Sequence, residues 1–149
     1  MKICDAVNSD RYKSDRAILH SDCNCFYASV ECLLNPNIRE LPVAVSGDAE
    51  NRHGIILAKN EIAKRYRQAK KKCPQLLTVP ARLDVYKKFS DKVRRIYAEY
   101  TDMVEPFGLD ESWLDISQNY KSDALTVAKE ISERVKDEIG ITVSIGVSF

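Results

Sequence analysis

The sequence lacks the features that mark membrane-spanning, secreted and zinc-binding proteins. No apolar run reaches the roughly 18 residues that suggest a membrane span, and residues 1–16 contain no apolar core of a signal peptide. The five cysteines are odd in number and include no Cys-x-x-Cys pair. They therefore indicate buried, reduced thiols. We expect a cytoplasmic protein that does not bind a membrane.

A strong net charge is also absent. The 149 residues include 23 Lys and Arg against 22 Asp and Glu, so the net charge of +1 gives no overall signal of a nucleic-acid binder. With 44% hydrophobic and 30% charged residues, the composition is that of a soluble globular protein, long enough for one domain with a small insertion. Basic residues concentrate between positions 64 and 95, which is typical of a solvated helix face.

Apolar spacing divides the chain into strands and helices. Setting aside residues 26–80, the expected order is strand, helix, hairpin, helix, strand, which is the βαββαβ order of ferredoxin-like folds. We therefore expect an α+β fold with a smaller α/β subdomain inserted after the first strand. Strands are expected at 17–20, 41–45, 55–58, 76–79 and 141–149, a hairpin at 104–116, and helices at 26–34, 60–73, 83–100 and 122–139.

Three acidic residues stand where strands of this fold end or turn. Asp22 follows the first strand, and Asp110 and Glu111 lie near the turn of the hairpin. The first strand and the hairpin are commonly neighbours in such a sheet, so the three carboxylates could converge on Mg²⁺, which prefers oxygen ligands. Acidic residues are also common in solvated turns, where Asp110 could form an Asx turn. The pattern alone leaves both interpretations open.

Two longer motifs contain these acids. Residues 20–31 read HSDCNCFYASVE and residues 104–115 read VEPFGLDESWLD. They resemble the first and second motifs of Y-family DNA polymerases, the translesion group that includes DNA polymerase IV and UmuC-like proteins. The resemblance covers residues 17–149, and two long motifs in the right order make it specific.

The resemblance implies a metal site. Asp22, Asp110 and Glu111 match the family's metal-binding catalytic carboxylates, and Cys23 would contribute its backbone carbonyl. The implied cofactor is a pair of Mg²⁺ ions. One departure is Gly108, which stands where relatives commonly carry serine, and it predicts no loss of chemistry.

The resemblance also implies nucleotide contacts. Tyr27 matches the steric-gate aromatic beneath the incoming sugar, where a 2′-hydroxyl would clash, although a tyrosine at this spacing could simply face the core. Phe26 matches the neighbouring aromatic that shapes the nucleotide pocket. Lys64 matches an arginine directed toward the triphosphate, and Lys59 is a further candidate for that contact.

The family's domain order extends to the whole chain. Residues 17–25 and 80–149 would form an incomplete palm, residues 26–79 the fingers, and residues 1–16 an N-terminal extension. The thumb and little-finger domains are absent from these residues, so we expect the isolated chain to polymerise weakly or not at all. The implied partners are primer–template DNA and deoxynucleoside triphosphates, with a sliding clamp as a partner of the absent C-terminal region.

The implied activity is template-directed DNA synthesis in damage tolerance and repair, by nucleotidyl transfer to a primer 3′-hydroxyl. A palm-type nucleotidyl cyclase is one alternative, because it also combines this topology with acidic metal ligands, but it has no use for a steric gate at Tyr27. A non-catalytic nucleic-acid-binding module is another. It should carry stacking aromatics on its central strands, whereas the hairpin offers only Phe107 and Trp113 beside acids that repel phosphate.

Overall fold

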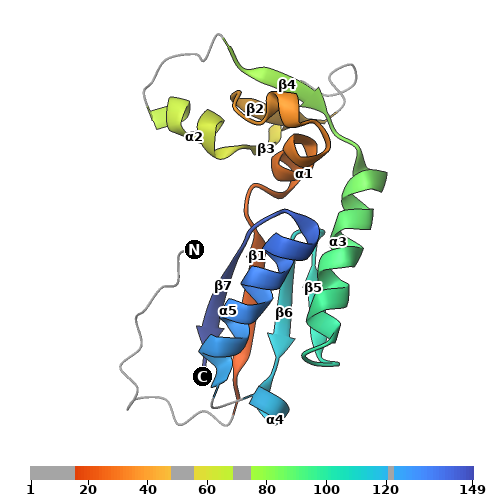
Figure 1. The fold of residues 1–149 in the computed structure, drawn as a ribbon, viewed down its shortest axis with the longest axis vertical. Helices are drawn as coiled ribbons and strands as arrows, with labels where there is room; N and C mark the ends of the chain where they lie inside the picture. The colour runs from red at the N-terminus through yellow and green to blue at the C-terminus, as the bar shows by residue number, and fades with distance from the viewer. Residues whose placement is uncertain (1–15, 48–55, 69–74, 121–122) are drawn as a thin grey trace. The chain divides into compact units, whose positions relative to one another are not determined.

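The computed structural model describes residues 16–47, 56–68, 75–120 and 123–149 (Figure 1). The chain separates into two compact units, each with its own sheet. Unit 1 combines Met1–Asn24 with Lys87–Phe149, and unit 2 is Cys25–Tyr86. Within the described ranges, no helix is long and apolar enough to cross a membrane.

Unit 1 contains a four-stranded antiparallel sheet in the order β5-β6-β1-β7. Its first strand, β1, therefore lies at the centre, between the second strand of the hairpin and the last strand of the chain. This is the strand order of the expected βαββαβ fold, so the predicted fold class is confirmed. The strands are β1 Ile18–Cys23, β5 Val104–Phe107, β6 Glu111–Asp115 and β7 Val143–Ser148.

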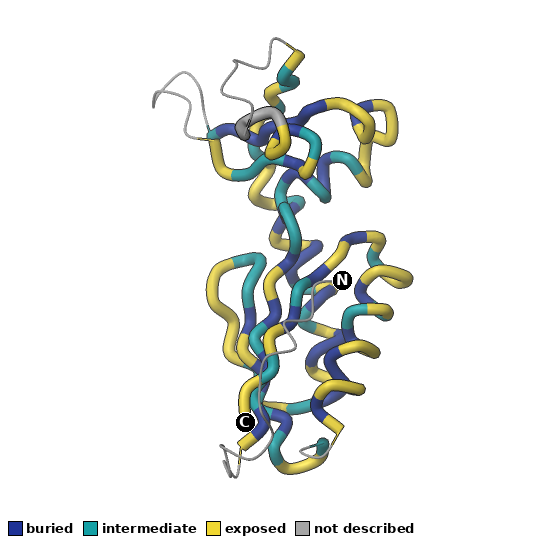
Figure 2. Tube along the Cα trace, turned by 90° about the vertical axis from the view of Figure 1, so that its left-hand side faces the viewer, coloured by how far each residue is buried: buried dark blue, intermediate teal, exposed yellow. Residues whose placement is uncertain are grey.

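Two helices lie against one face of this sheet (Figure 1). They are α5 Ala124–Arg134 and α3 Leu83–Ala98, of which the residues from Lys87 onward belong to unit 1. Both bury an amphipathic face against the sheet. Buried positions gather where the helices face the strands, while much of the opposite face is exposed (Figure 2). The buried side chains include Val93, Ile96 and Tyr97 of α3, Val127, Ala128 and Ile131 of α5, and Leu19 and Leu114 of the sheet.

The helix expected at 122–139 differs in detail from the prediction. Helix α5 passes into a π-helical turn, η3 Val135–Ile139, and ends at Gly140, which adopts the left-handed conformation (φ 87°) that favours glycine. Asp123 precedes α5 but makes no capping hydrogen bond with its side chain, and Ser122 lies outside the described residues. A short helix, α4 Ser117–Tyr120, was not expected from the apolar spacing because none of its residues is buried.

Unit 2 contains a three-stranded sheet in the order β3-β2-β4. Strand β2 is antiparallel to β3 and parallel to β4, and all four of its residues are buried. The helix expected to reach residue 73 is described as far as Gln68, and its remainder lies outside the described residues. The elements are α1 Phe26–Leu34, η1 Pro36–Ile38, β2 Val43–Ser46, β3 Ile56–Lys59, α2 Glu61–Gln68 and β4 Leu77–Pro80.

A buried asparagine ties the start of α2 to β2. The Asn60 side-chain oxygen accepts hydrogen bonds from the amides of Val43 (3.1 Å) and Ala63 (2.9 Å), and its amide group donates to the carbonyl of Leu41 (2.7 Å). Asn60 is only 8% exposed, and these partners satisfy its polar groups. Asn60 is the N-cap residue of α2, a position where asparagine is preferred because its side-chain oxygen accepts a hydrogen bond from an amide of the first turn.

Candidate metal centre and nucleotide contacts

The strand pairing of unit 1 brings Asp22 and Glu111, which are far apart in sequence, next to each other. Asp22 and Glu111 are partners in the antiparallel ladder between β1 and β6. Directly opposed residues of such a ladder point to the same face of the sheet, with Cβ atoms about 5 Å apart. The face in question is the one away from the helices, since the neighbouring Ser21 and Ser112 are both buried. The expected proximity of β1 and the hairpin is therefore observed.

Asp110 is attached to the same end of the sheet through its backbone. The amide of Cys23 donates a hydrogen bond to the Asp110 carbonyl at 2.9 Å, which ties the end of β1 to the last residue of the hairpin turn. Partial burial raises the pKa of the Asp110 carboxyl above its usual value, and repulsion from Glu111 raises it further. A cation bound beside these carboxylates would relieve both effects.

Cys23 faces the opposite side of the sheet from the acids. Its side chain is buried, in keeping with the alternation of a strand. Burial raises the pKa of the Cys23 thiol to about 12, and the charges of Asp110 and Asp22 contribute. The thiol therefore stays protonated at neutral pH and is a poor metal ligand. This agrees with a role for the Cys23 backbone carbonyl, which stays a prediction.

Over the part of the chain that the structure describes, no three His, Cys, Asp or Glu side chains form a ready-made metal site. The backbone brings Asp22, Asp110 and Glu111 to one end of the sheet without gathering their side chains around one point. Their donor chemistry nonetheless fits Mg²⁺, which takes one or two protein carboxylates and completes its octahedron with waters and substrate phosphates. The assignment of the three acids as ligands stays a prediction.

Glu111 lies beside a stacked pair of His20 and Trp113 that the sequence did not identify as part of the site. The Nε2 atom of His20 lies 3.2 Å from Oε2 of Glu111. The His20 ring stacks on the indole of Trp113, with centroids 4.1 Å apart and an angle of 22° between the planes. His20 and Trp113 are also partners in the β1–β6 ladder. The available signal was spacing: His20 lies two residues before Asp22 and Trp113 two after Glu111, so all four share a face.

The hairpin turn that presents Asp110 depends on a glycine and an arginine. Gly108 adopts φ 76°, in the left-handed region where side chains other than glycine are strained. Arg94 of α3 donates a hydrogen bond from Nη2 to the Gly108 carbonyl at 2.5 Å. The turn is thereby fixed both by its own backbone conformation and by the helix beside it.

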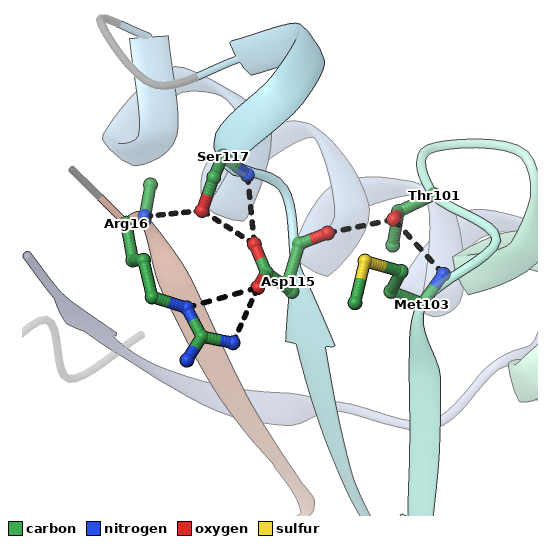
Figure 3. A network of polar contacts seen from close by, with 6 residues as sticks. Arg16, Thr101, Met103, Asp115 and Ser117 are labelled. Atoms are coloured by element: carbon green, nitrogen blue, oxygen red, sulfur yellow. Dashed lines mark hydrogen bonds and ion pairs between the residues drawn. The ribbon is translucent and has the colours of Figure 1, made fainter.

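Asp115, the last residue of β6, has a carboxylate that is surrounded by hydrogen-bond donors, unlike that of Asp110 (Figure 3). Arg16 donates to Oδ2 from Nε (3.2 Å) and Nη2 (2.8 Å), and the Ser117 amide donates to Oδ1 at 3.0 Å. The Ser117 hydroxyl also donates to Oδ1 and accepts from the amide of Ala17 at 2.8 Å. The Ser117 and Arg16 donors lower the pKa of Asp115 to about 2. This carboxylate joins the end of β6 to the start of β1 and to α4.

Phe26 and Tyr27 of unit 2 lie at the start of α1. Phe26 is fully buried and Tyr27 is half-buried, with their ring centroids 5.3 Å apart in an edge-to-face arrangement. The preceding residue, Cys25, adopts φ 50° and ψ 36°, which turns the chain sharply into the helix. The predicted nucleotide roles of the two aromatics stay predictions.

The two predicted lysine contacts have different surroundings within unit 2. The Lys64 ammonium lies 3.1 Å from a carboxylate oxygen of Glu61, three residues earlier on α2, and the Cys25 thiol lies 3.0 Å from that same oxygen. Hydrogen bonding to the Cys25 thiol, and then to Glu61, raises the pKa of Lys64, and the lysine side chain is 52% exposed. Lys59 ends β3 opposite Ala44 and is partly exposed. Whether either lysine contacts a triphosphate stays a prediction.

Sequence comparison supports the motif-based interpretation. The chain is 54% identical over 144 residues to DNA polymerase IV of Acetivibrio thermocellus, covering 90% of this chain and 36% of that protein. It is 42% identical over 146 residues to DNA polymerase IV of Bacteroides fragilis, covering 91% and 40%. The chain thus spans about two fifths of the length of these curated relatives.

Solved structures share the fold. The crystal structure of DinB from Sulfolobus solfataricus superposes with a TM-score of 0.79 at 24% identity, covering 89% of this chain and 42% of that one. An insertion ternary complex of Dbh DNA polymerase gives a TM-score of 0.79 at 23% identity, covering 89% and 42%. Residues 21–149 match the model of the impB/mucB/samB family, a range that contains both long motifs. The chain therefore belongs to the impB/mucB/samB family of Y-family polymerase domains.

Proposed function

We propose that this chain is the palm and fingers portion of a template-directed DNA polymerase of the translesion type. The observation that carries the proposal is the register of β1 against β6, which pairs Asp22 with Glu111 and ties Asp110 to Cys23. An arrangement of this kind at the end of a ferredoxin-like sheet suits phosphoryl transfer, which depends on positioning and charge stabilisation. Family membership and the DNA polymerase IV relatives support the same assignment.

The proposed reaction joins a deoxynucleotide to a primer. The primer 3′-hydroxyl releases its proton to solvent, and its oxygen bonds to the α-phosphorus while the bond to the β-phosphate oxygen breaks and pyrophosphate leaves. Asp22, Asp110, Glu111 and the Cys23 carbonyl would hold two Mg²⁺ ions, whose chemistry is to activate the attacking oxygen and stabilise the leaving one. The protein's own contribution is to keep these oxygens at one end of the sheet, and the Asp110 carbonyl bond to Cys23 serves this purpose.

The proposal divides the chain by role. Residues 17–25 and 80–149 would be the palm, and residues 26–79 the fingers. In the fingers, Tyr27 would exclude nucleotides that carry a 2′-hydroxyl, and Phe26 would help shape the nucleotide pocket. Lys64 would reach a phosphate only by exchanging its contact with Glu61 (3.1 Å), so its contribution should be smaller than that of a dedicated cation. A sliding clamp as a further partner is supported by the resemblance alone.

Primer extension by the complete protein tests the proposal. The wild type should add deoxynucleotides to a primer in a template-dependent manner, and Asp110→Ala should abolish extension. Asp123→Ala is a matched control, since Asp123 is an exposed aspartate of unit 1 outside the acidic end of the sheet. Unchanged extension by Asp110→Ala would remove Asp110 from the ligand set, and a wild type without template-dependent extension would contradict the assigned activity.

A second measurement avoids turnover altogether. Mg²⁺ that binds the folded state alone stabilises it in proportion to its affinity, so millimolar Mg²⁺ should raise the melting temperature of the 149-residue chain. The increase should vanish in Asp110→Asn, which keeps the shape of the side chain. The isolated chain should extend primers poorly, and vigorous extension by these residues alone would contradict that expectation.

A further inference from the structure

Unit 2 contains a buried carboxylate that the proposed reaction does not use. Glu31 of α1 is only 4% exposed, and a buried charge is costly unless it is fully paired. Arg82 donates to it from Nε (3.0 Å) and Nη2 (2.5 Å), and the Tyr86 hydroxyl donates to Oε1 at 2.7 Å. Three donors therefore fix the Glu31 carboxylate from outside its own helix.

The ring of Tyr86 continues this network to Tyr27. Tyr86 is fully buried, and its ring meets that of Tyr27 edge-to-face, with centroids 5.0 Å apart and an angle of 78° between the planes. It also lies 6.3 Å from the Phe26 ring at 62°. Both geometries fall in the range that aromatic pairs prefer. The three rings form one cluster at the start of α1. Among the described contacts, Tyr86 is the member of this cluster that hydrogen-bonds to Glu31.

Helix geometry explains how one tyrosine reaches both residues. Tyr27 and Glu31 are four residues apart on α1, so they lie one turn apart on the same face. Tyr86 spans that turn, with its hydroxyl on Glu31 and its ring on Tyr27. Burial and the Glu31 charge raise the pKa of Tyr86 to about 12, so its hydroxyl remains a donor at neutral pH.

We propose that Glu31, Arg82 and Tyr86 are positioning residues for Tyr27, and that they set how strictly a ribonucleotide is excluded. The inference rests on the proposed role of Tyr27 as a steric gate. A ring excludes a 2′-hydroxyl only while it cannot rotate aside, and Tyr27 is half-buried, so part of its restraint must come from its neighbours. Tyr86 supplies a ring edge whose own position is fixed by a hydrogen bond to a buried charge.

A purely structural role would have a different consequence. If the network only joins α1 to the start of α3, breaking it lowers stability and leaves sugar selectivity unchanged. Tyr97 provides a matched control for this distinction. It belongs to α3, is fully buried, and its hydroxyl is 2.7 Å from Oγ of Ser21, so Tyr97→Phe also removes one short buried hydroxyl contact. It lies in unit 1, outside the Tyr27 cluster.

The experiment measures kcat/KM for a deoxynucleotide and for the ribonucleotide of the same base in the complete protein. Tyr86→Phe keeps the ring and removes only the hydroxyl, and Glu31→Gln keeps the shape and removes the charge. Each should shift the ratio toward the ribonucleotide by about 3- to 10-fold, the effect of weakening one aromatic contact. Tyr97→Phe should leave the ratio unchanged. In a Tyr27→Ala background, adding Tyr86→Phe should produce no further shift, because the gate is already gone.

The outcomes separate the inference from the proposed function. If Tyr27→Ala admits ribonucleotides but Tyr86→Phe and Glu31→Gln do not, the positioning role is overturned and the gate stands. Equal shifts in Tyr86→Phe and Tyr97→Phe would assign the effect to general loosening and also overturn it. If Tyr27→Ala itself admits no ribonucleotides, the gate and its positioning residues fall together. Melting temperatures of all variants identify any that fail to fold, and Tyr86→Phe then decides in place of Glu31→Gln.

Discussion

Strand β6 has one aspartate directly before its first residue and another as its last residue, and the two carboxylates differ in the charges and donors around them. Asp115 is the last residue of β6 and receives hydrogen bonds from Arg16 and Ser117, which lower its pKa to about 2 (Figure 3). Asp110 directly precedes β6, where partial burial and the neighbouring Glu111 raise its pKa. One carboxylate is supplied with donors by the protein, and the other is placed against a second negative charge.

The difference supports the proposed roles, in which Asp115 stabilises the fold and Asp110 binds a metal ion. A structural carboxylate is surrounded by donors because its burial must be offset. An acid held near another acid makes the folded state less favourable at neutral pH, and such arrangements are characteristic of sites that bind cations or protons. The second motif, residues 104–115, therefore contains both kinds of aspartate five positions apart.

The largest expected effect separates the two aspartates by activity. In the complete protein, Asp110→Asn should reduce the rate of single-nucleotide addition by about 10²- to 10³-fold, the cost of losing one group that stabilises charge in a transition state. Asp115→Asn should retain most of the rate. Steady-state kinetics on a primer–template measure both. Comparable losses in the two variants would remove the distinction between them.

Stability should show the reverse order. Asp115→Ala removes the acceptor of the Ser117 amide and of Arg16, so the free energy of unfolding should fall by about 1–2 kcal/mol. Most of this comes from the Ser117 contacts, because the Arg16 side chain is 67% exposed and ion pairs of that kind contribute little. Asp110→Asn removes a disfavoured charge and should leave stability unchanged or slightly higher. Urea unfolding of the 149-residue chain gives both values.

Acid pH should weaken the Asp115 contribution. Its pKa is lower in the folded state than the usual value of about 3.9, so its stabilisation is complete above that value and is lost as pH falls toward about 2. Between about pH 4 and pH 2, stability should therefore decline less steeply in Asp115→Asn than in the wild type. Asp102→Asn, at an exposed aspartate before β5, is the control. Parallel pH profiles for wild type and Asp115→Asn would contradict the assignment.

The smallest expected effect concerns the turn before Asp110. Gly108→Ala places a side chain at φ 76°, which costs about 1 kcal/mol, and its Cβ would lie 3.5 Å from a carboxylate oxygen of Asp110. Primer extension should decline modestly along with stability, because Asp110 shifts while remaining present. Gly146→Ala is a suitable control, since the nearest atom to its added Cβ would be 4.0 Å away. Gly108→Ala without any loss of stability would show that the turn tolerates the substitution.

Much of the fold was accessible from spacing alone. The apolar positions of α3 repeat with helical period, and β1, β6 and β7 follow runs that the sequence presents directly. Helix α4 was missed because it buries no residue, and the Asp123 side chain makes no capping hydrogen bond at the start of α5. Elements with an apolar face can be identified from the sequence, whereas exposed turns and caps depend on local geometry that residue identity specifies weakly.

The sequence by itself determined the βαββαβ order, the family and the residues that make up its acidic motif. Tertiary structure decided how those residues differ from one another. Only the register of β1 against β6 shows that Asp22 opposes Glu111, and only the contacts around Asp115 distinguish it from Asp110. Likewise, Glu31 and Tyr86 are far apart in sequence and meet through one hydrogen bond. The physical reason is that periodicity reports which face of an element is buried, while charge pairing depends on which elements become neighbours.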